Sequence, residues 1–309
     1  MKVNTIATLL VVCISVFAGC GRNSRELQPV TPVTPVTPDE PSGEFRSPGA
    51  PKYNVVAHRG GSAECGYPDN SRASLQYAMS LKCYASECDI YWTKDDNVIV
   101  AHADGGGKVN GFYPWEATVA QIQAQKKLSN GETVPTLAEF IDIVMAEGSC
   151  TKLWLDIKNI TSPSTLTDYP INATKRACEI ITEKKAKNFC EFICTGNATV
   201  WKSAIVYTQK AGCNIGWMAG KDPNGHKENS STWANLCAKQ YMTPYGSKFT
   251  VSQFKDAGVA ISVYNVDKKS GDSNAVYDSF EVNYYIQNYK DMKAICTNYP
   301  SWLMSELSK

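Results

Sequence analysis

The chain has 309 residues, 43% of them hydrophobic and 20% charged, which is the composition of a globular protein with a large core. Its 31 lysines and arginines almost balance 30 acidic residues, so the formal net charge is +1. This balance argues against the positive surface that nucleic-acid binding requires, and small or weakly charged partners fit it better.

The first twenty residues have the pattern of an export signal. Lys2 precedes an apolar stretch over residues 6–18, which is shorter than the roughly 20 residues of a membrane span. Ala18 and Gly19 then precede Cys20, as in a bacterial lipobox. The pattern predicts a lipoprotein signal peptide over 1–20 and a lipidated Cys20 that anchors an exported chain to the cell envelope. An ordinary secretory signal with an incidental cysteine is the alternative.

Residues 21–52 are rich in proline, threonine and glycine, as in VTPVTPVTPDEPSGE, and carry little apolar bulk. Such a segment predicts an extended tether between the membrane and a folded domain. Ten cysteines follow the tether, and their pairing cannot be read from the sequence. They form no pattern typical of a zinc site with the three histidines.

Residues 53–309 have the length and periodicity of a (β/α)₈ barrel. Amphipathic stretches separate eight short apolar runs, which are YNVVA, ASECDIYW, LWLDIK, FCEFICTG, NIGWMAG, QYMTP, AISVYNV and KAICTN. The clearest helix pattern covers residues 136–147, where Thr136 and Glu139 form a capping box and Gly148 ends the helix. A doubly wound open sheet has the same alternation and remains the alternative.

One apolar run, at residues 98–101, follows the second strand after only a few turn-forming residues. A parallel crossover needs about a dozen residues, so the run cannot be the next barrel strand. We therefore expect a small β-hairpin insertion after strand 2.

Candidate catalytic and binding residues follow the first predicted strand. His58 and Arg59 come directly after an apolar run, and in such a barrel the strand ends carry the working residues. Gly60 and Gly61 would let the backbone approach a ligand closely. A lone histidine at a strand end is as readily structural, so its interpretation depends on its neighbours.

Carboxylates supply those neighbours. Glu87 and Asp89 are two residues apart on one strand, hence on one face, and Asp156 and Lys158 repeat this spacing on the next barrel strand. Carboxylates that point together favour a cation between them. With oxygen ligands alone, that cation would be hard, Ca²⁺ or Mg²⁺.

His102 ends the hairpin strand and completes the set. Two histidines, two cationic side chains and a metal suit a phosphodiester, because the cations neutralise the phosphate charge. One histidine would take a proton from the attacking hydroxyl and the other would protonate the leaving alkoxide.

The segments AHRGG, YPDNS, ECDIYWTKDDNVIVAHADG, TVPTLAEF, LWLDIK, VYNVD and ICTNYP, in this order, resemble the glycerophosphodiester phosphodiesterases through nearly the whole of residues 53–309. The resemblance implies a TIM barrel and metal-dependent hydrolysis of glycerophosphodiesters to sn-glycerol 3-phosphate and an alcohol. It implies that His58 and His102 form the acid/base pair. It also implies that Arg59 and Lys158 contact the phosphate.

The resemblance further implies that Glu87, Asp89 and Asp156 bind one divalent cation. Glutamate is usual where Asp156 stands, so the departure bears on metal affinity and choice. Tyr264 stands where tryptophan is usual, which would alter the pocket for the alcohol group.

Three further positions complete the sequence interpretation. Asp69 stands where the family usually has glutamate, and Asn298 replaces a common aspartate at what looks like a structural position. His226 lies in a polar stretch and is interpreted as a surface loop residue. Two other functions remain open, namely hydrolysis of another phosphodiester, such as a phosphoinositide or a sugar phosphate, and non-catalytic binding of a phosphorylated ligand.

Overall fold

The computed structural model describes residues 45–160, 166–220, 222–242, 248–271 and 273–309. The predicted signal peptide, Cys20 and the tether up to residue 44 lie outside these residues. Among the described residues, no helix combines the length and the apolar character that a bilayer crossing requires.

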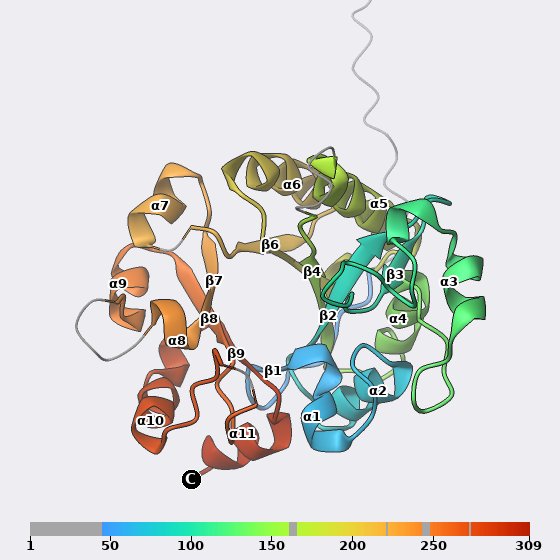
Figure 1. Ribbon diagram of the computed structural model, residues 1–309. Helices are drawn as coiled ribbons and strands as arrows, with labels where there is room; N and C mark the ends of the chain where they lie inside the picture. Colours follow the sequence, from blue (N-terminus) through green and yellow to red (C-terminus); the bar gives the residue numbers. More distant parts are fainter. Residues whose placement is uncertain (1–44, 161–165, 221, 243–247, 272) are drawn as a thin grey trace, which may run out of the picture. The chain divides into compact units, whose positions relative to one another are not determined.

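Eight parallel strands close into a barrel, as the sequence predicts (Figure 1). The barrel strands are β1 (Val55–Ala57), β2 (Ala85–Trp92), β4 (Lys152–Ile157), β5 (Cys190–Cys194), β6 (Asn214–Trp217), β7 (Trp233–Cys237), β8 (Ala260–Tyr264) and β9 (Ala294–Thr297). Val56 of β1 pairs with Ala85 of β2 on one side and with Cys296 of β9 on the other. Both neighbours of β1 are therefore present, and the alternative of an open doubly wound sheet is wrong.

Helices surround the ring of strands (Figure 1). They are α1 (Ser62–Cys65), α2 (Arg72–Ser80), α3 (Val119–Gln125), α4 (Leu137–Val144), α5 (Tyr169–Glu183), α6 (Ala198–Lys210), α7 (Pro223–Glu228), α8 (Ala238–Tyr241), α9 (Val251–Asp256), α10 (Ser279–Gln287) and α11 (Pro300–Glu306). In α4, the predicted capping box is present, because Thr136 Oγ1 accepts from Glu139 N–H while Glu139 accepts from Thr136 N–H. The helix ends at Val144, three residues earlier than the sequence predicts.

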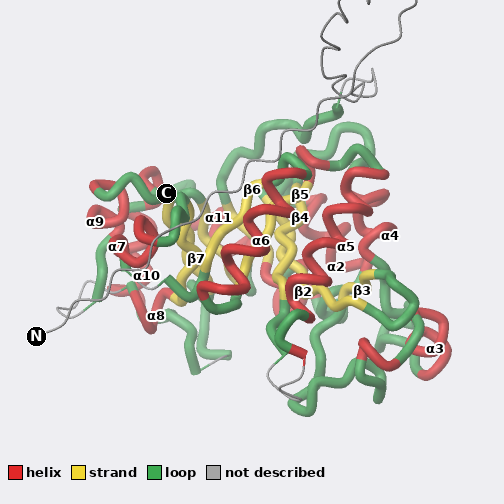
Figure 2. The backbone as a smooth tube through the Cα atoms, turned by 90° about the horizontal axis from the view of Figure 1, so that it is seen from above, coloured by secondary structure: helices red, strands yellow, loops and turns green. Residues whose placement is uncertain are grey.

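The predicted hairpin is also present. β3 (Val98–Val100) pairs antiparallel with β2, with Ile99 opposite Tyr91, and lies outside the ring. The chain then leaves the barrel through α3 before it returns in α4, and Figure 2 shows this excursion beside β2.

The sixth barrel strand, β7, lies at Trp233–Cys237, and its prediction at residues 240–244 is wrong. In β7 the apolar run is broken by Asn235, whose side chain lines a cavity in the barrel mouth. The apolar signal downstream comes partly from Met242, which follows α8 and is fully buried in the core around β7 and β8.

Aromatic side chains fill part of the barrel interior. Trp154 of β4 and Trp233 of β7 are buried, with ring centroids 5.0 Å apart, and they pack with Ile193 and Cys296. This layer separates the carboxyl ends of the strands, which we call the mouth, from their amino ends, the floor. At the floor, Gly49 N–H donates to Ser149 C=O at 2.8 Å, so part of the predicted tether lies against the barrel.

Candidate active site

The end of β1 runs directly into a 3-10 turn over His58–Gly60. Gly60 has φ of 83°, and a Cβ there would lie 2.5 Å from Ser74 Oγ on α2. A Cβ on Gly61 would lie 2.9 Å from Pro300. These glycines therefore allow close packing of the turn against two helices. That they also bring backbone close to a ligand stays a prediction.

Three carboxylates meet at the mouth, as the strand pattern predicts. Glu87 and Asp89 project from β2, and Asp89 stands directly opposite Asp156 of β4 in the parallel register. All three side chains are buried, and one oxygen from each lies within 4.8 Å of the others.

Two cationic side chains lie among these carboxylates. Lys158 Nζ contacts Asp156 Oδ2 at 2.5 Å and forms an ion pair with Asp89 Oδ1. Arg59 Nε lies 3.1 Å from Asp89 Oδ2, and the Arg59 backbone N–H donates to Glu87 Oε2 at 3.0 Å. Burial alone would lower the pKa of Lys158, but Asp156 and Asp89 raise it above its ordinary value, so the ammonium stays charged.

The carboxylates respond unequally to this environment. Burial, together with the charges of Asp89 and Asp156, raises the pKa of Glu87 well above its ordinary value. Burial also raises the pKa of Asp156. For Asp89, burial acts in the same direction, but Lys158 and Arg59 outweigh it and lower the pKa. Three carboxylates against two cations leave an excess of buried negative charge, which a further cation would relieve.

Two oxygens are positioned to take such a cation. Asp156 Oδ1 is buried and accepts no hydrogen bond from the described residues, and Glu87 Oε1 likewise has none there. A buried carboxylate oxygen without a donor is costly unless an ion completes it. An all-oxygen ligand set fits a hard divalent ion such as Ca²⁺ or Mg²⁺. The cluster therefore fits the predicted metal site.

A cavity of about 230 Å³ opens above these residues. Six of the eight residues singled out from the sequence line it, and they are His58, Arg59, Glu87, Asp156, Lys158 and Tyr264. Asp89 lies just beneath, in contact with Arg59 and Lys158. Burial raises the pKa of Tyr264, so its hydroxyl stays protonated and can donate a hydrogen bond.

His102 lines a neighbouring groove of about 680 Å³, beside Asp69 and Asn70. Its ring makes no hydrogen bond within the described part of the chain. Burial lowers the pKa of His102, and burial together with Arg59 lowers that of His58. Both imidazoles are therefore neutral at pH 7 and available to accept a proton.

The loop before α2 supplies contacts to which the sequence interpretation gave no role. Asp69 Oδ2 accepts from Arg59 Nη1 at 2.9 Å, and Asn70 Nδ2 donates to Asp89 Oδ2 at 2.8 Å. Asn70 Oδ1 also accepts from the Asp89 backbone N–H at 3.2 Å. The Pro-Asp-Asn tripeptide was the available signal, but only the fold brings it to β2.

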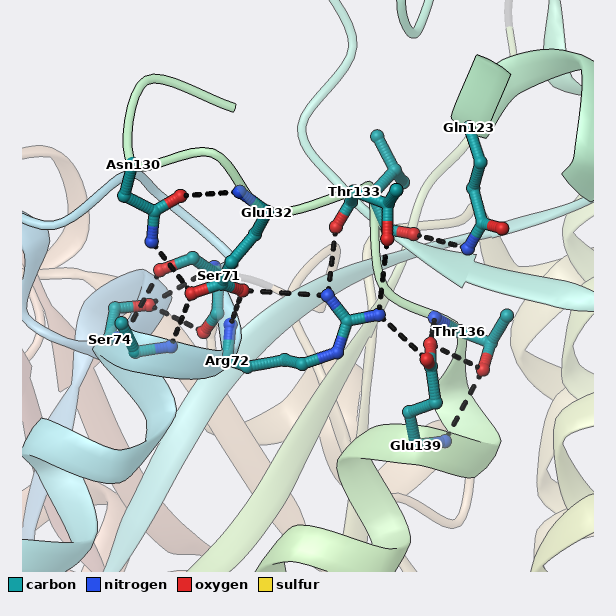
Figure 3. Close-up of polar contacts among 11 residues, drawn as sticks. Ser71, Arg72, Ser74, Gln123, Asn130, Glu132, Thr133, Thr136 and Glu139 are labelled. Carbon is teal, nitrogen blue, oxygen red and sulfur yellow. Dashed lines mark hydrogen bonds and ion pairs between the residues drawn. The ribbon is translucent and has the colours of Figure 1, made fainter. Parts of the chain in front are cut away.

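A polar cluster holds this loop from behind (Figure 3). Glu132 Oε2 accepts from the Arg72 N–H at 2.8 Å, and Glu132 Oε1 accepts from the Ala73 N–H at 3.1 Å. The Arg72 guanidinium reaches Glu139 Oε1 at 2.7 Å and the Thr133 carbonyl at 2.9 Å. The cluster thus joins the starts of α2 and α4 to the end of the excursion.

Two groups lie away from the mouth. His226 is fully buried, and its Nδ1 lies 2.8 Å from Ser231 Oγ, so its interpretation as a surface loop residue is wrong. The ten described cysteines form no disulfides with one another, and eight of them are buried. Burial raises the pKa of thiols such as Cys88 and Cys190, which keeps them protonated.

Comparison with known structures supports the fold. A glycerophosphodiester phosphodiesterase from Parabacteroides distasonis superposes with a TM-score of 0.63 at 21% identity, covering 84% of this chain and 98% of that one. An Oleispira antarctica phosphodiesterase in complex with the product sn-glycerol-3-phosphate gives a TM-score of 0.59 at 18% identity, covering 83% and 97%.

In sequence, a glycerophosphodiester phosphodiesterase of Caldanaerobacter subterraneus subsp. tengcongensis is 32% identical over 100 residues, which is 29% of this chain and 40% of that protein. The matched part therefore spans less than half of that relative. The model of the glycerophosphoryl diester phosphodiesterase family matches residues 58–301, from the first site histidine to the start of α11. The chain belongs to the glycerophosphoryl diester phosphodiesterase family.

Proposed function

We propose that this protein hydrolyses glycerophosphodiesters to sn-glycerol 3-phosphate and an alcohol, with one divalent cation and two histidines. The observation that carries the proposal is the meeting of Glu87, Asp89 and Asp156 with Arg59 and His58 around one cavity, in a chain of this family. Support for the product comes from the Oleispira protein, which binds sn-glycerol-3-phosphate.

The phosphate would lie between the two cationic side chains. Arg59 is held by Asp69 and Asp89, which fixes the guanidinium plane and leaves Nη2 without a partner among the described residues. Lys158 is anchored by Asp89 and Asp156. Preorganised donors of this kind stabilise developing charge on phosphate oxygens without reorganisation.

Glu87, Asp89 and Asp156 would hold the cation, which when bound supplies charge neutralisation and Lewis-acid polarisation of the phosphate. Mg²⁺ and Ca²⁺ both suit these oxygens.

The histidines would move protons. His58 lines the 230 Å³ cavity and His102 the neighbouring groove, so a substrate that spans both would place the attacking hydroxyl near one imidazole and the leaving ester oxygen near the other. One neutral imidazole accepts the proton of the attacking hydroxyl, and the other, once protonated, gives a proton to the leaving alkoxide. Tyr264 would donate to a hydroxyl of the bound substrate.

The N-terminal pattern supports a location for this activity. We propose export and attachment to the bacterial cell envelope through a lipidated Cys20. Labelling with a radioactive fatty acid, lost in Cys20→Ser, would test this part separately from catalysis.

The test of the reaction is release of sn-glycerol 3-phosphate from glycerophosphocholine and glycerophosphoethanolamine, with Ca²⁺, Mg²⁺ or a chelator. We expect metal-dependent release that His58→Ala and His102→Ala each abolish. Asp142→Asn is the matched control, because Asp142 is an exposed partner of Lys184 on a helix outside the barrel.

Two outcomes would reject the proposal in different ways. Hydrolysis of other phosphodiesters alone would identify another head group as the substrate. Tight binding of phosphorylated ligands without turnover of any phosphodiester would favour the non-catalytic alternative.

A further inference from the structure

His58 is held from behind by a chain of hydrogen bonds. Its Nδ1 lies 2.7 Å from Oδ1 of Asn298, which follows β9 and is 240 positions away in the sequence. Its Nε2 points to the other side, 3.8 Å from Glu87 Oε2 in the cluster of three carboxylates at the mouth. The ring therefore has one nitrogen facing the protein and one facing the site.

The amide of Asn298 is itself oriented by a buried carboxylate. Asn298 Nδ2 donates to Asp267 Oδ2 at 2.8 Å, and the Asn298 backbone N–H donates to Asp267 Oδ1 at 2.8 Å. Thr297 Oγ1 donates to the same Oδ1 at 3.0 Å. Asp267 is only 1% exposed, so these donors replace water around it.

This arrangement decides which amide atom meets the histidine. A carboxylate only accepts hydrogen bonds, so the Asn298 amide must turn its NH₂ group toward Asp267. Its Oδ1 then faces His58 and can only accept. The hydrogen of neutral His58 must therefore be on Nδ1, which leaves the lone pair on Nε2.

We propose that Asp267 and Asn298 are positioning residues that hold neutral His58 in the Nδ1–H tautomer, which leaves the Nε2 lone pair facing the site and able to accept a proton. The inference rests on the proposed function. Asp267 acts only through Asn298, and neither residue touches the substrate.

The same pair would also assist after proton transfer. When Nε2 has taken a proton, the ring is a cation whose Nδ1–H still points at the Asn298 carbonyl. The Asp267 charge polarises that amide, so the negative end of its dipole faces the imidazolium. Asp267 thus stabilises the His58 imidazolium through Asn298, without taking up or releasing a proton itself.

The first test needs no activity. The full chain with ¹⁵N-labelled histidine contains three imidazoles, and the His58 signals are those lost in His58→Gln. We expect a protonated Nδ1 and an unprotonated Nε2 in neutral His58. In Asp267→Asn, some or most of neutral His58 should instead carry its proton on Nε2, because the Asn298 amide is then free to flip. A wild-type ring protonated at Nε2 would overturn the inference, whether or not the protein hydrolyses glycerophosphodiesters.

The second test is kinetic. Asp267→Asn should lower kcat by roughly 10- to 100-fold, part of what general base catalysis supplies, with little change in KM. The double variant D267N/N298D places a carboxylate directly on His58 Nδ1–H and an amide behind it, and should recover most of the lost kcat. Unchanged kcat in Asp267→Asn, or a folded double variant no faster than Asp267→Asn, would overturn the positioning role. Failure of the wild type to hydrolyse any phosphodiester would reject the proposed function and leave the tautomer assignment to the first test.

Discussion

Buried charges lie at both ends of the barrel, but they are organised in opposite ways. At the mouth, Glu87, Asp89 and Asp156 share Arg59 and Lys158. Their negative charge exceeds the positive charge, and one buried oxygen of Asp156 has no hydrogen-bond donor among the described residues.

At the floor a single carboxylate is surrounded by donors. Glu191 Oε1 lies 3.1 Å from Lys152 Nζ and 3.3 Å from Lys293 Nζ, and Glu191 Oε2 accepts from Trp154 Nε1 at 2.8 Å and from Tyr84 at 3.0 Å. Burial would raise the pKa of Glu191, but Lys293 and Lys152 lower it to about 2. The floor cluster is complete without a ligand.

The difference separates a structural cluster from a functional one. Buried charges that have all their hydrogen-bond and charge partners within the protein make the fold rigid and need no ligand. Buried charges that lack such partners are retained only where a bound ion or ligand supplies them. Replacing a carboxylate by its amide at the mouth should therefore lower activity more than stability. The same replacement at the floor should lower stability more than activity.

The largest effect is expected from Glu87→Gln. It should lower kcat/KM for glycerophosphodiesters by at least about 1000-fold, or about 4 kcal/mol, because a proposed metal ligand is lost. Stability of the metal-free protein should not fall, since a repelling carboxylate has been removed. Steady-state kinetics and urea unfolding measure the two quantities, and a variant that keeps its activity but unfolds early would reverse the comparison.

Glu191→Gln should do the reverse. It leaves Lys152 and Lys293 without their counter-charge and should lower the free energy of unfolding by about 3 kcal/mol, while the folded fraction keeps the proposed activity. Glu179→Gln is the matched control, because Glu179 pairs with Arg176 on the exposed side of α5 and should cost less than about 1 kcal/mol. Equal losses in the two variants would contradict the structural role of the floor.

The two ends should also differ in their response to acid. The folded pKa of Glu191 lies below its ordinary value, so its stabilisation, about 3 kcal/mol, is present above pH 4.5 and lost as the pH falls toward 2. Glu87 has a raised pKa, so in the presence of chelator its contribution is most favourable at low pH and is lost as the pH rises through its folded pKa. Unfolding by urea across this range should converge for wild type and Glu191→Gln near pH 2. If the unfolding free energies of the two proteins stay equally far apart down to pH 2, Glu191 does not cause the loss of stability in acid.

A smaller effect is expected at the cluster behind the mouth. Arg72→Met removes the bonds to Glu139 and Thr133 and should lower stability by about 1–2 kcal/mol. It should also raise KM, because α2 positions Asp69 and Asn70. Arg176→Met, on α5, is the control with a guanidinium of similar exposure, and an equal change in KM there would exclude a specific role for Arg72.

The smallest effect is expected from Tyr264→Phe. The ring still fills its place in the cavity and only the hydroxyl is lost, so KM should rise less than about tenfold with kcat unchanged. A larger fall in kcat would place the hydroxyl at the reacting atoms instead.

Local sequence patterns were sufficient wherever spacing decides geometry. The i, i+2 spacing put Glu87 and Asp89 on one face, and the short gap before β3 required a hairpin. The capping box fixed the start of α4 at Thr136. Each of these features depends on neighbours within a few residues, which is why the sequence alone predicts them.

Prediction from the sequence is wrong where residues far away along the chain determine the surroundings of a side chain. The sequence misplaces β7 because Asn235, which lines the cavity, interrupts its apolar run. The sequence predicts His226 at the surface because its neighbours along the chain are polar, although the fold buries it against Trp217 and Phe254.

By itself, then, the sequence determined the alternation of strands and helices, the hairpin and the group of carboxylates at the strand ends, because strand period and strand ends follow from local order. Tertiary structure alone decided which oxygens remain open and which nitrogen of His58 faces them. The reason is physical: Asp267, Asn298 and His58 follow different strands, and only closure of the barrel brings their hydrogen-bonding groups within 3 Å of one another.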